Sequence, residues 1–301
     1  MRYLALAAVV LGTACTRTTT FVDANTDDRF RVATFNVRRF FDTVCESGAC
    51  SNDDYEEQPS PDAFEARATQ LADAIRRLDA DVISLQEIET QVCLDAVMAR
   101  LTDLMPYGAL GEIHTVASVD VAVLSKTPLE KITGHRDDNP LPLPDGSFTV
   151  FSRELFEVQV RARNGTKVVL FATHFRSKSN DDPARRLAEA QVSAQVVSGF
   201  GAAEPTALVL LGGDLNDTPG SPPLNALVVD GGLVRVADDV PLADQATYRY
   251  QGNGQAIDHL LLAPNAAASA RTPMSSRVWR DGTGWGGSDH AALTSDFTLP
   301  L

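Results

Sequence analysis

Apolar segments that end in polar residues recur six times along this 301-residue chain, and this repetition constrains the fold more than any other feature. Segments with apolar residues spaced three and four apart alternate with them, and Phe64 and Leu71 share one such helical face. Alternation of short strands with amphipathic helices is typical of an α/β domain. We therefore expect strands over residues 30–37, 81–85, 119–124, 151–160, 167–173, 207–211, 256–262 and 291–298, and helices over residues 64–78 and 183–200.

Eight polar residues at these strand ends indicate the function. They are Asn36, Glu87, His174, Asp214, Asn216, Asp258, Asp289 and His290, within the segments TFN, SLQE, THF, GDLN, IDH and SDH. Each has an ordinary explanation when taken alone: Glu87 as a surface carboxylate, Asn36 as a turn residue and His174 as a hydrogen-bonded core histidine. Strand ends in α/β folds project side chains into a common crevice. Six coincidences in one order therefore favour a shared site for metal-assisted phosphoryl chemistry.

This ordered set resembles the endonuclease/exonuclease/phosphatase superfamily, the deoxyribonuclease I-like proteins, over residues 30–298. The segment FSRE, at residues 151–154, resembles a strand of deoxyribonuclease I that carries a phosphate-contacting arginine. The segment HFRSKS, at residues 174–179, resembles, together with Arg185 and Arg186, the bacterial extracellular nucleases of that superfamily. The resemblance implies a four-layer sandwich of two packed mixed β-sheets flanked by helices. It also implies a divalent-metal-dependent phosphoesterase, with an exported nuclease acting on DNA or RNA as the first candidate.

The resemblance also implies a role for each matching residue. The ligands of Mg²⁺ or Mn²⁺, with Ca²⁺ as a further candidate, would be Glu87, Asn36 and Asp289, because hard cations prefer oxygen ligands. The catalytic residues would be His174, Asp214, Asn216, Asp258 and His290, and the contacts to substrate phosphate would be Arg153, Arg176 and Lys178. His290 oriented by Asp258 is one candidate general base, and Asp214 is the other.

Two further histidine roles follow from the same comparison. His174 would be the general acid or a hydrogen-bond donor to phosphate. His259 should face away from the site, because alternate residues of a strand point to opposite faces. Arg185 and Arg186 either extend a phosphate-binding edge or form the solvated face of the helix over residues 183–200.

The N-terminus reads as an export signal. A basic start at Arg2 precedes an apolar run over residues 4–11, which is too short to span a bilayer. Small residues then precede Cys15, as in bacterial lipoproteins, so residues 1–15 are expected to be a lipoprotein signal and residues 16–28 a flexible tether. A domain over residues 29–301 would follow, in a lipoprotein anchored through Cys15 at the outer membrane or in the periplasm, or in a secreted protein.

The composition limits how a substrate could be held. A net charge of −14 and a sequence pI near 4.7 argue against general adhesion to polyphosphate, so any phosphate must be bound locally. The sequence has no aromatic-rich basic stripe of the kind that would suggest a platform for single-stranded nucleic acid. The acidic residues 46–62 are expected to form a solvated loop, because they lack the spacing of an EF-hand. In an oxidising compartment two of Cys45, Cys50 and Cys93 could pair, and the sequence leaves the choice open.

Two alternatives to a nuclease stay open at this stage. The first is a sphingomyelinase-like phosphatase or phosphodiesterase on lipid headgroups or small phosphate esters, for which residues 279–285, with Trp279 and Trp285, are the candidate lipid-contacting loop. The second is a catalytically silent surface-binding lipoprotein, which the intact set of eight residues disfavours. We expect a monomer in each case.

Overall fold

The computed structural model describes residues 29–51 and 53–299. The expected export signal, the anchor at Cys15 and the tether over residues 16–28 lie outside the described residues. Among the residues that are described, no helix is both long and apolar enough to cross a bilayer.

The strands are β1 (Arg29–Phe40), β2 (Val82–Ile88), β3 (Tyr107–Gly111), β4 (Asp120–Ser125), β5 (Leu129–Gly134), β6 (Leu141–Pro142), β7 (Phe148–Thr149), β8 (Phe156–Arg161), β9 (Lys167–His174), β10 (Leu208–Asp214), β11 (Val234–Arg235), β12 (Tyr248–Tyr250), β13 (Asn253–Gln255), β14 (Asp258–Leu262), β15 (Arg277–Trp279) and β16 (Ala292–Thr298). The α-helices are α1 (Pro61–Leu78), α2 (Gln91–Met98), α3 (Pro183–Ala203) and α4 (Pro222–Asn225). Shorter helical turns are η2 (Ala226–Asp230), η3 (Val236–Asp239), η4 (Leu242–Asp244) and η5 (Ala266–Ala270).

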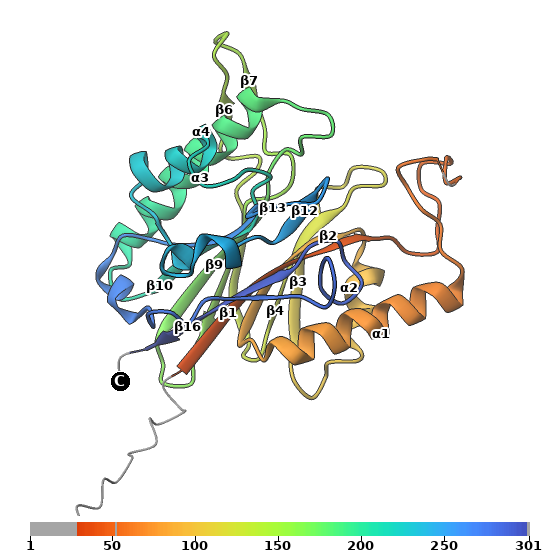
Figure 1. Ribbon diagram of the computed structural model, residues 1–301, viewed down its shortest axis with the longest axis horizontal. Coiled ribbons are helices and arrows are strands. Elements are labelled where there is room, and N and C mark those ends of the chain that lie inside the picture. Colours follow the sequence, from red (N-terminus) through yellow and green to blue (C-terminus); the bar gives the residue numbers. More distant parts are fainter. Residues whose placement is uncertain (1–28, 52, 300–301) are drawn as a thin grey trace, which may run out of the picture.

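Two six-stranded mixed sheets stack face to face and carry helices on their outer faces (Figure 1). The first sheet has the order β15-β16-β1-β2-β4-β3, and the second has the order β11-β14-β10-β9-β8-β5. An apolar layer between the sheets includes Val32, Val82 and Val121 from the first and Leu170 and Leu210 from the second. The four-layer sandwich implied by the family resemblance is therefore confirmed.

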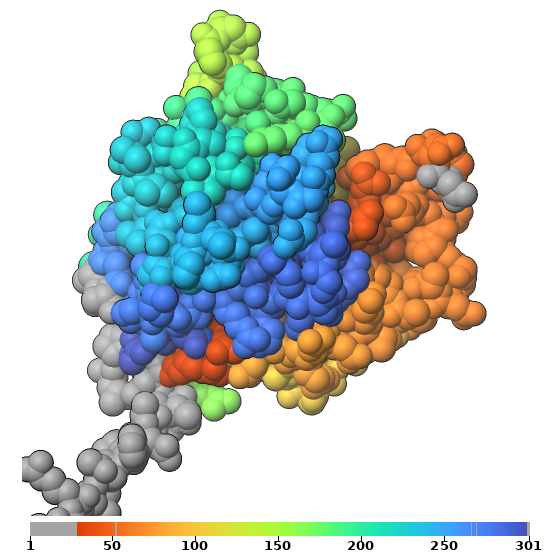
Figure 2. Space-filling model, in the orientation of Figure 1, coloured from red at the N-terminus to blue at the C-terminus, as the bar shows by residue number. Residues whose placement is uncertain are grey.

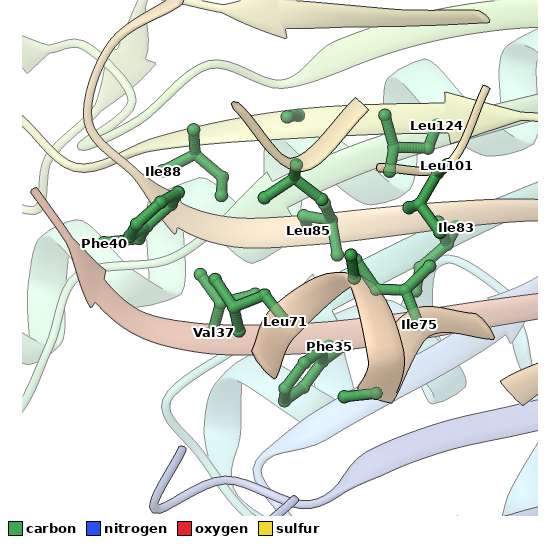
Figure 3. Close-up of a cluster of buried hydrophobic side chains, with 14 of the residues drawn as sticks. Phe35, Val37, Phe40, Leu71, Ile75, Ile83, Leu85, Ile88, Leu101 and Leu124 are labelled. Atoms are coloured by element: carbon green, nitrogen blue, oxygen red, sulfur yellow. The ribbon is translucent and has the colours of Figure 1, made fainter. Parts of the chain in front are cut away.

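Helix α1 shows how one outer layer forms. The Ser60 side chain accepts a hydrogen bond from the Ala63 N–H and so caps the helix, and the chain leaves it through Asp79 in the left-handed conformation. Leu71 and Ile75, one turn apart, lie on the face that packs on the first sheet (Figure 3). Burial of such side chains stabilises a fold by about 1.5–3 kcal/mol each.

The expected strand over residues 151–160 is wrong in its first half, because β8 begins only at Phe156. Residues 151–155, which precede β8, are held by hydrogen bonds between carboxylate side chains and backbone N–H groups and not by pairing with a neighbouring strand. The Glu189 carboxylate accepts the Ser152 N–H at 2.7 Å, and the Glu154 carboxylate accepts the N–H groups of His135 and Arg136. The segment that contains Arg153 is consequently a loop.

The first sheet loses its regular register where the candidate ligands lie. The pairing of β1 with β2 shifts between Asn36 and Phe40, and the pairing of β2 with β4 shifts between Gln86 and Ile88. Glu87 lies at the second irregularity with a φ of 68°. Left-handed backbone at residues other than glycine costs about 1–3 kcal/mol, and such strain clusters at functional sites.

The loop that follows β1 contains a disulfide between Cys45 and Cys50, with 6.0 Å between their Cα atoms. Cys93 is a free, buried thiol on α2. The expectation of a fully solvated acidic loop is wrong in part, because Glu56 is buried and accepts the N–H groups of Glu46 and Ser47 at 2.6 and 2.7 Å.

Candidate active site

All eight polar strand-end residues meet at one end of the sandwich. The first sheet and its flanks supply Asn36, Glu87, Asp289 and His290, whereas the second supplies His174, Asp214, Asn216 and Asp258. The convergence follows from strand direction, because β1, β2, β9 and β10 end where the antiparallel β14 and β16 begin. In the second sheet, Asp214 lies opposite both His174 and Asp258.

Asn36 connects the two halves of the site. Its Nδ2 donates to Glu87 Oε1 and to Asp214 Oδ2, each at 3.1 Å, and its Oδ1 accepts the Arg38 N–H at 2.9 Å. Asn36 is fully buried, so these hydrogen bonds satisfy an amide that would otherwise be costly to bury. The interaction fixes the distance between a carboxylate of the first sheet and one of the second.

His290 and Asp258 form a buried pair. His290 Nδ1 lies 2.9 Å from Asp258 Oδ2, and His290 Nε2 lies 3.9 Å from Asp214 Oδ2. Burial opposes protonation of His290, but the negative charges of Asp258, Asp214 and Asp289 outweigh it and raise its pKa to about 10. The imidazole is therefore a cation at neutral pH in the metal-free protein. Tyr248 packs on its ring, with 4.9 Å between ring centroids.

Burial shifts the pKa of Asp214 and of His174 so that each favours its neutral form. Burial and the charge of Asp258 raise the pKa of Asp214 to about 7, and His290 offsets part of that rise. Burial, with Arg153 and His290 nearby, holds the pKa of His174 well below its usual value. His174 Nε2 lies 3.6 Å from Asp214 Oδ2 and 4.0 Å from Glu87 Oε1. A neutral imidazole in this place can donate one hydrogen bond to a substrate oxygen.

The donor set fits a divalent cation. Asp258 Oδ1 and Asp289 Oδ1 are buried without a hydrogen-bond partner, which is costly for carboxylate oxygens unless a cation compensates them. Glu87, Asp289 and Asn36 offer oxygen ligands of the kind that Mg²⁺ and Mn²⁺ prefer. A second group of ligand atoms, on Asp214, Asp258 and His290, lies within 4.8 Å of one another.

A cleft of about 1260 Å³ opens over these residues, and basic side chains line it. They are the three predicted phosphate contacts, Arg153, Arg176 and Lys178, and two that sequence reasoning missed, Arg38 and Arg39. In Figure 2 the hairpin of β12 and β13, light blue, lies beside the green segment that follows β9. Both border the cleft.

Each of the three predicted phosphate contacts has a polar partner within the protein. The Arg153 guanidinium donates to the Val119 carbonyl at 2.9 Å, and Lys178 pairs with Asp217 at 2.8 Å. The Arg176 guanidinium donates to the Asn180 carbonyl at 3.1 Å. All three residues line the cleft, and each of these interactions uses only part of the five N–H groups of arginine or the three of lysine.

Neither expectation for Arg186 is correct. It is 3% exposed and pairs with Asp217 and Asp181, so it is neither a solvated residue nor a substrate contact. Its guanidinium also donates to the Arg176 carbonyl at 3.1 Å, which supports the segment that carries the cleft arginine. His259 is buried between Arg235 and the Asp217 carbonyl and does not line the cleft.

Tyr55 and Tyr248 also line the cleft and were missed. Arg38 and Arg39 lie two and three residues after Asn36, so the polar end of that strand could have signalled them. Tyr55 lies in the acidic loop, where no periodic pattern marks it.

Two packed mixed sheets with this carboxylate and histidine set at their common edge define the class of metal-dependent phosphoesterases. The chain matches the Endonuclease/Exonuclease/phosphatase family over residues 33–290, and it belongs to that family. Members of the family are metal-dependent phosphoesterases, and the chain is an enzyme of that class.

Solved structures with the same fold are distant in sequence. TDP2 from Caenorhabditis elegans is 17% identical, with a TM-score of 0.61 over 90% of this chain and 74% of that one. TDP2 from D. rerio, complexed with a single strand DNA product, is 16% identical, with a TM-score of 0.61 over 90% of this chain and 99% of that one. Sphingomyelinase C from Streptomyces griseocarneus is 19% identical, with a TM-score of 0.57 over 89% of this chain and 99% of that one. No curated protein matches the sequence.

A buried carboxylate on α3 holds two of the cleft segments together. Glu189 is fully buried and accepts the N–H groups of Ser152 and Arg176, each at 2.7 Å. Glu189→Gln keeps only one acceptor oxygen, so one buried N–H loses its partner. The free energy of unfolding should therefore fall by about 1–3 kcal/mol. We also expect a higher KM for polymeric substrate, measured by initial rates beside thermal melting.

Glu157→Gln is the matched control for Glu189→Gln. Glu157 is a buried carboxylate on β8 that pairs with His135 at 2.8 Å and does not line the cleft. This variant should lose stability without a change in KM. Equal KM values for both variants would show that Glu189 does not position the cleft segments.

The pKa of His290 gives stability a pH dependence. Its pKa is about 10 in the folded protein and near 6.5 when unfolded, so its stabilising contribution is complete below pH 6.5 and is lost as the pH rises toward 10. In EDTA, the melting temperature should fall between pH 7 and pH 9.5. His290→Asn should flatten this slope, and an unchanged slope in that variant would assign the dependence to other groups.

Proposed function

We propose that the chain is an exported nuclease that hydrolyses phosphodiester bonds of DNA or RNA with Mg²⁺ or Mn²⁺. The observation that carries this proposal is the set of five basic residues around the hydrolytic centre of a protein with a net charge of −14. A polyanionic strand needs several phosphate contacts along its length, whereas one headgroup needs few. The DNA product in the D. rerio TDP2 structure supports nucleic acid as a substrate for this fold.

The buried residues divide the work of hydrolysis among them. Asp214, with a pKa of about 7, takes a proton from the attacking water, because a general base works best when its pKa is near the operating pH. The water oxygen bonds to phosphorus while the ester P–O bond on the opposite side breaks. Protonated His290, held by Asp258, stabilises the negative charge on a non-bridging oxygen, and Asn216 orients the phosphate.

His174 and a bound cation would stabilise the phosphate and its leaving oxygen. Neutral His174 donates a hydrogen bond toward the phosphate, and the departing alkoxide takes its proton from solvent. A cation held by Glu87, Asp289 and Asn36 would neutralise charge that grows on the phosphoryl and leaving oxygens. Between the two candidate bases, the pKa directions favour Asp214 over His290.

The structure of residues 279–285, the candidate lipid-contacting loop, favours nucleic acid over lipid as the substrate. Trp285 is 2% exposed, its ring is tilted by 59° against that of Trp279 with 5.6 Å between centroids, and the Arg77 guanidinium lies 4.0 Å from its ring centroid. Its indole N–H donates to the Ala74 carbonyl. Both tryptophans therefore serve packing, and neither is placed to enter a lipid layer.

Export is supported by the apolar N-terminal run and by the disulfide between Cys45 and Cys50, because disulfides persist in oxidising compartments. Attachment of lipid at Cys15 would hold the enzyme at a membrane surface. Cell fractionation of the wild type and of Cys15→Ser tests this part. The wild type should sediment with membranes and the variant should be released, and equal distribution of the two would argue against the anchor.

The activity is tested by incubating purified protein with plasmid DNA, RNA and sphingomyelin vesicles in Mg²⁺, Mn²⁺, Ca²⁺ or EDTA. We expect cleavage of a nucleic acid that EDTA abolishes. Intact DNA and RNA in every metal and at every pH would refute the nuclease proposal. Release of phosphocholine from the vesicles would instead support a lipid phosphodiesterase, the function that the similarity to sphingomyelinase C suggests.

A further inference from the structure

Tyr55 and Arg39 form a stacked pair on the rim of the cleft. The Arg39 guanidinium carbon lies 4.8 Å from the centroid of the Tyr55 ring, and the rings of Phe41 and Tyr55 are perpendicular, with 6.0 Å between their centroids and 86° between their planes. Tyr55 nevertheless remains 47% exposed. An exposed aromatic ring that lines the cleft is accessible to a ligand bound there.

The stack lies next to the hydrolytic centre. The Arg39 backbone N–H donates to Glu87 Oε2 at 2.8 Å, so a residue of the stack directly contacts a candidate metal ligand. Tyr55 also lines the cleft with Arg153 and Arg38. A group resting on the stack would belong to a nucleotide close to the scissile phosphate.

The loop that carries Tyr55 is held in place before any ligand arrives. The Cys45–Cys50 disulfide closes its first turn, and the buried Glu56 carboxylate accepts two of its N–H groups. Glu46 Oε2 accepts the Ala117 N–H at 3.2 Å, which attaches the loop to the segment before β4. A held loop loses little conformational entropy on binding, so its contacts contribute more fully to affinity.

The chemistry of the stack selects among the ligands that aromatic rings can bind. Aromatic faces attract quaternary ammonium groups such as choline, but Arg39 already places a cation at the Tyr55 ring, and Arg38 and Arg153 add positive charge nearby. An uncharged, flat nucleobase has no such repulsion and stacks on both aromatic rings and guanidinium planes. A base can do so only when it has left a duplex stack.

We propose that Tyr55 and Arg39 form a stacking subsite for an unpaired nucleobase next to the scissile phosphate, so that the enzyme prefers single-stranded substrate. This inference rests on the proposed nuclease function. The two residues are separated in the sequence, so their pairing could not be predicted from an aromatic-rich basic stripe.

A double-mutant cycle between protein and substrate tests the subsite. The probes are single-stranded oligonucleotides, as DNA and as RNA, with one phosphodiester among phosphorothioate linkages and with either a base or an abasic residue at each flanking position. Tyr55→Ala should lower kcat/KM on the base-containing strand by about fivefold to a hundredfold, the contribution expected of one stacked base. On the strand that is abasic at the contacted position, this additional loss should disappear. Tyr55→Trp should restore the preference.

Tyr107→Ala is the matched control. Tyr107 is 39% exposed on β3, pairs with Ser125 at the far end of β4 and does not line the cleft. This variant should match the wild type on every strand. Equal losses in Tyr55→Ala on base-containing and abasic strands would overturn the subsite.

Binding measured in EDTA separates this inference from the function on which it rests. Fluorescence anisotropy of the same strands reports base stacking without hydrolysis. A wild type that cleaves no nucleic acid but binds the base-containing strand more tightly through Tyr55 would refute the nuclease and keep the subsite. A wild type that cleaves nucleic acid but whose binding does not depend on Tyr55 would keep the nuclease proposal and refute the subsite.

Discussion

Asp214→Asn is expected to lower kcat by about 10²-fold to 10⁴-fold, because the variant removes the proposed general base and leaves no group of suitable pKa in its place. Asp214 Oδ1 accepts the Asn216 N–H at 2.9 Å, and Oδ2 accepts from Asn36, so an asparagine keeps the shape of the site but satisfies only one of these donors. The loss should therefore be in kcat more than in KM. Single-turnover rates at saturating substrate measure it.

The pH profile of the same variant distinguishes the two candidate bases. The wild-type rate should rise with pH through the pKa of Asp214, about 7 in the metal-free protein, and this rise should be missing from the residual activity of Asp214→Asn. Asp258→Asn is the comparison, since it weakens the support of His290 and leaves Asp214 in place. If Asp214→Asn retained wild-type kcat, His290 would become the base.

Glu87→Gln should lower kcat/KM by on the order of 10³-fold, because a cation at this site contributes several kcal/mol of transition-state stabilisation. The glutamine can still accept the Arg39 N–H, which preserves the local backbone, but its amide nitrogen cannot accept the hydrogen bond from Asn36. Loss of one negative ligand should also weaken cation binding. Isothermal titration with Mn²⁺ should show lower affinity, and Mn²⁺ should raise the melting temperature less than it does for the wild type.

Glu130→Gln controls for the loss of a carboxylate elsewhere. Glu130 lies on β5, pairs with Arg161 on the surface and does not line the cleft. Its activity and metal response should equal those of the wild type. A Glu87→Gln enzyme with full activity at saturating Mn²⁺ would contradict a role of this carboxylate in catalysis.

Much of the fold could be predicted from local patterns. Leu71 and Ile75 mark the buried face of α1 by spacing alone, and the Asn164-Gly165 pair correctly predicts the hairpin between β8 and β9, where Gly165 has a φ of 89°. The short edge strands, such as β3 and β11, could not be predicted, because few residues give no reliable period. That two sheets stack, and do not form one, came only from the family resemblance.

The site residues that lie at strand ends could be predicted from the sequence. Those whose positions depend on contacts between distant segments could not. All eight predicted site residues converge, since parallel strands end at one edge. The burial of Arg186 depends on Asp217 and Asp181, which no local pattern connects to it. The position of Tyr55 depends on a disulfide and on Glu56. Such arrangements arise from contacts between segments, which a single sequence does not specify.

The position of β16 has a consequence for when the enzyme gains activity. This last strand pairs with β1, the first, and Asp289 and His290 immediately precede it. A growing polypeptide therefore lacks two of its eight site residues until residue 290 has been synthesised, and it has no complete centre until β16 docks beside β1. A polypeptide that stops before residue 289 therefore has no complete hydrolytic centre.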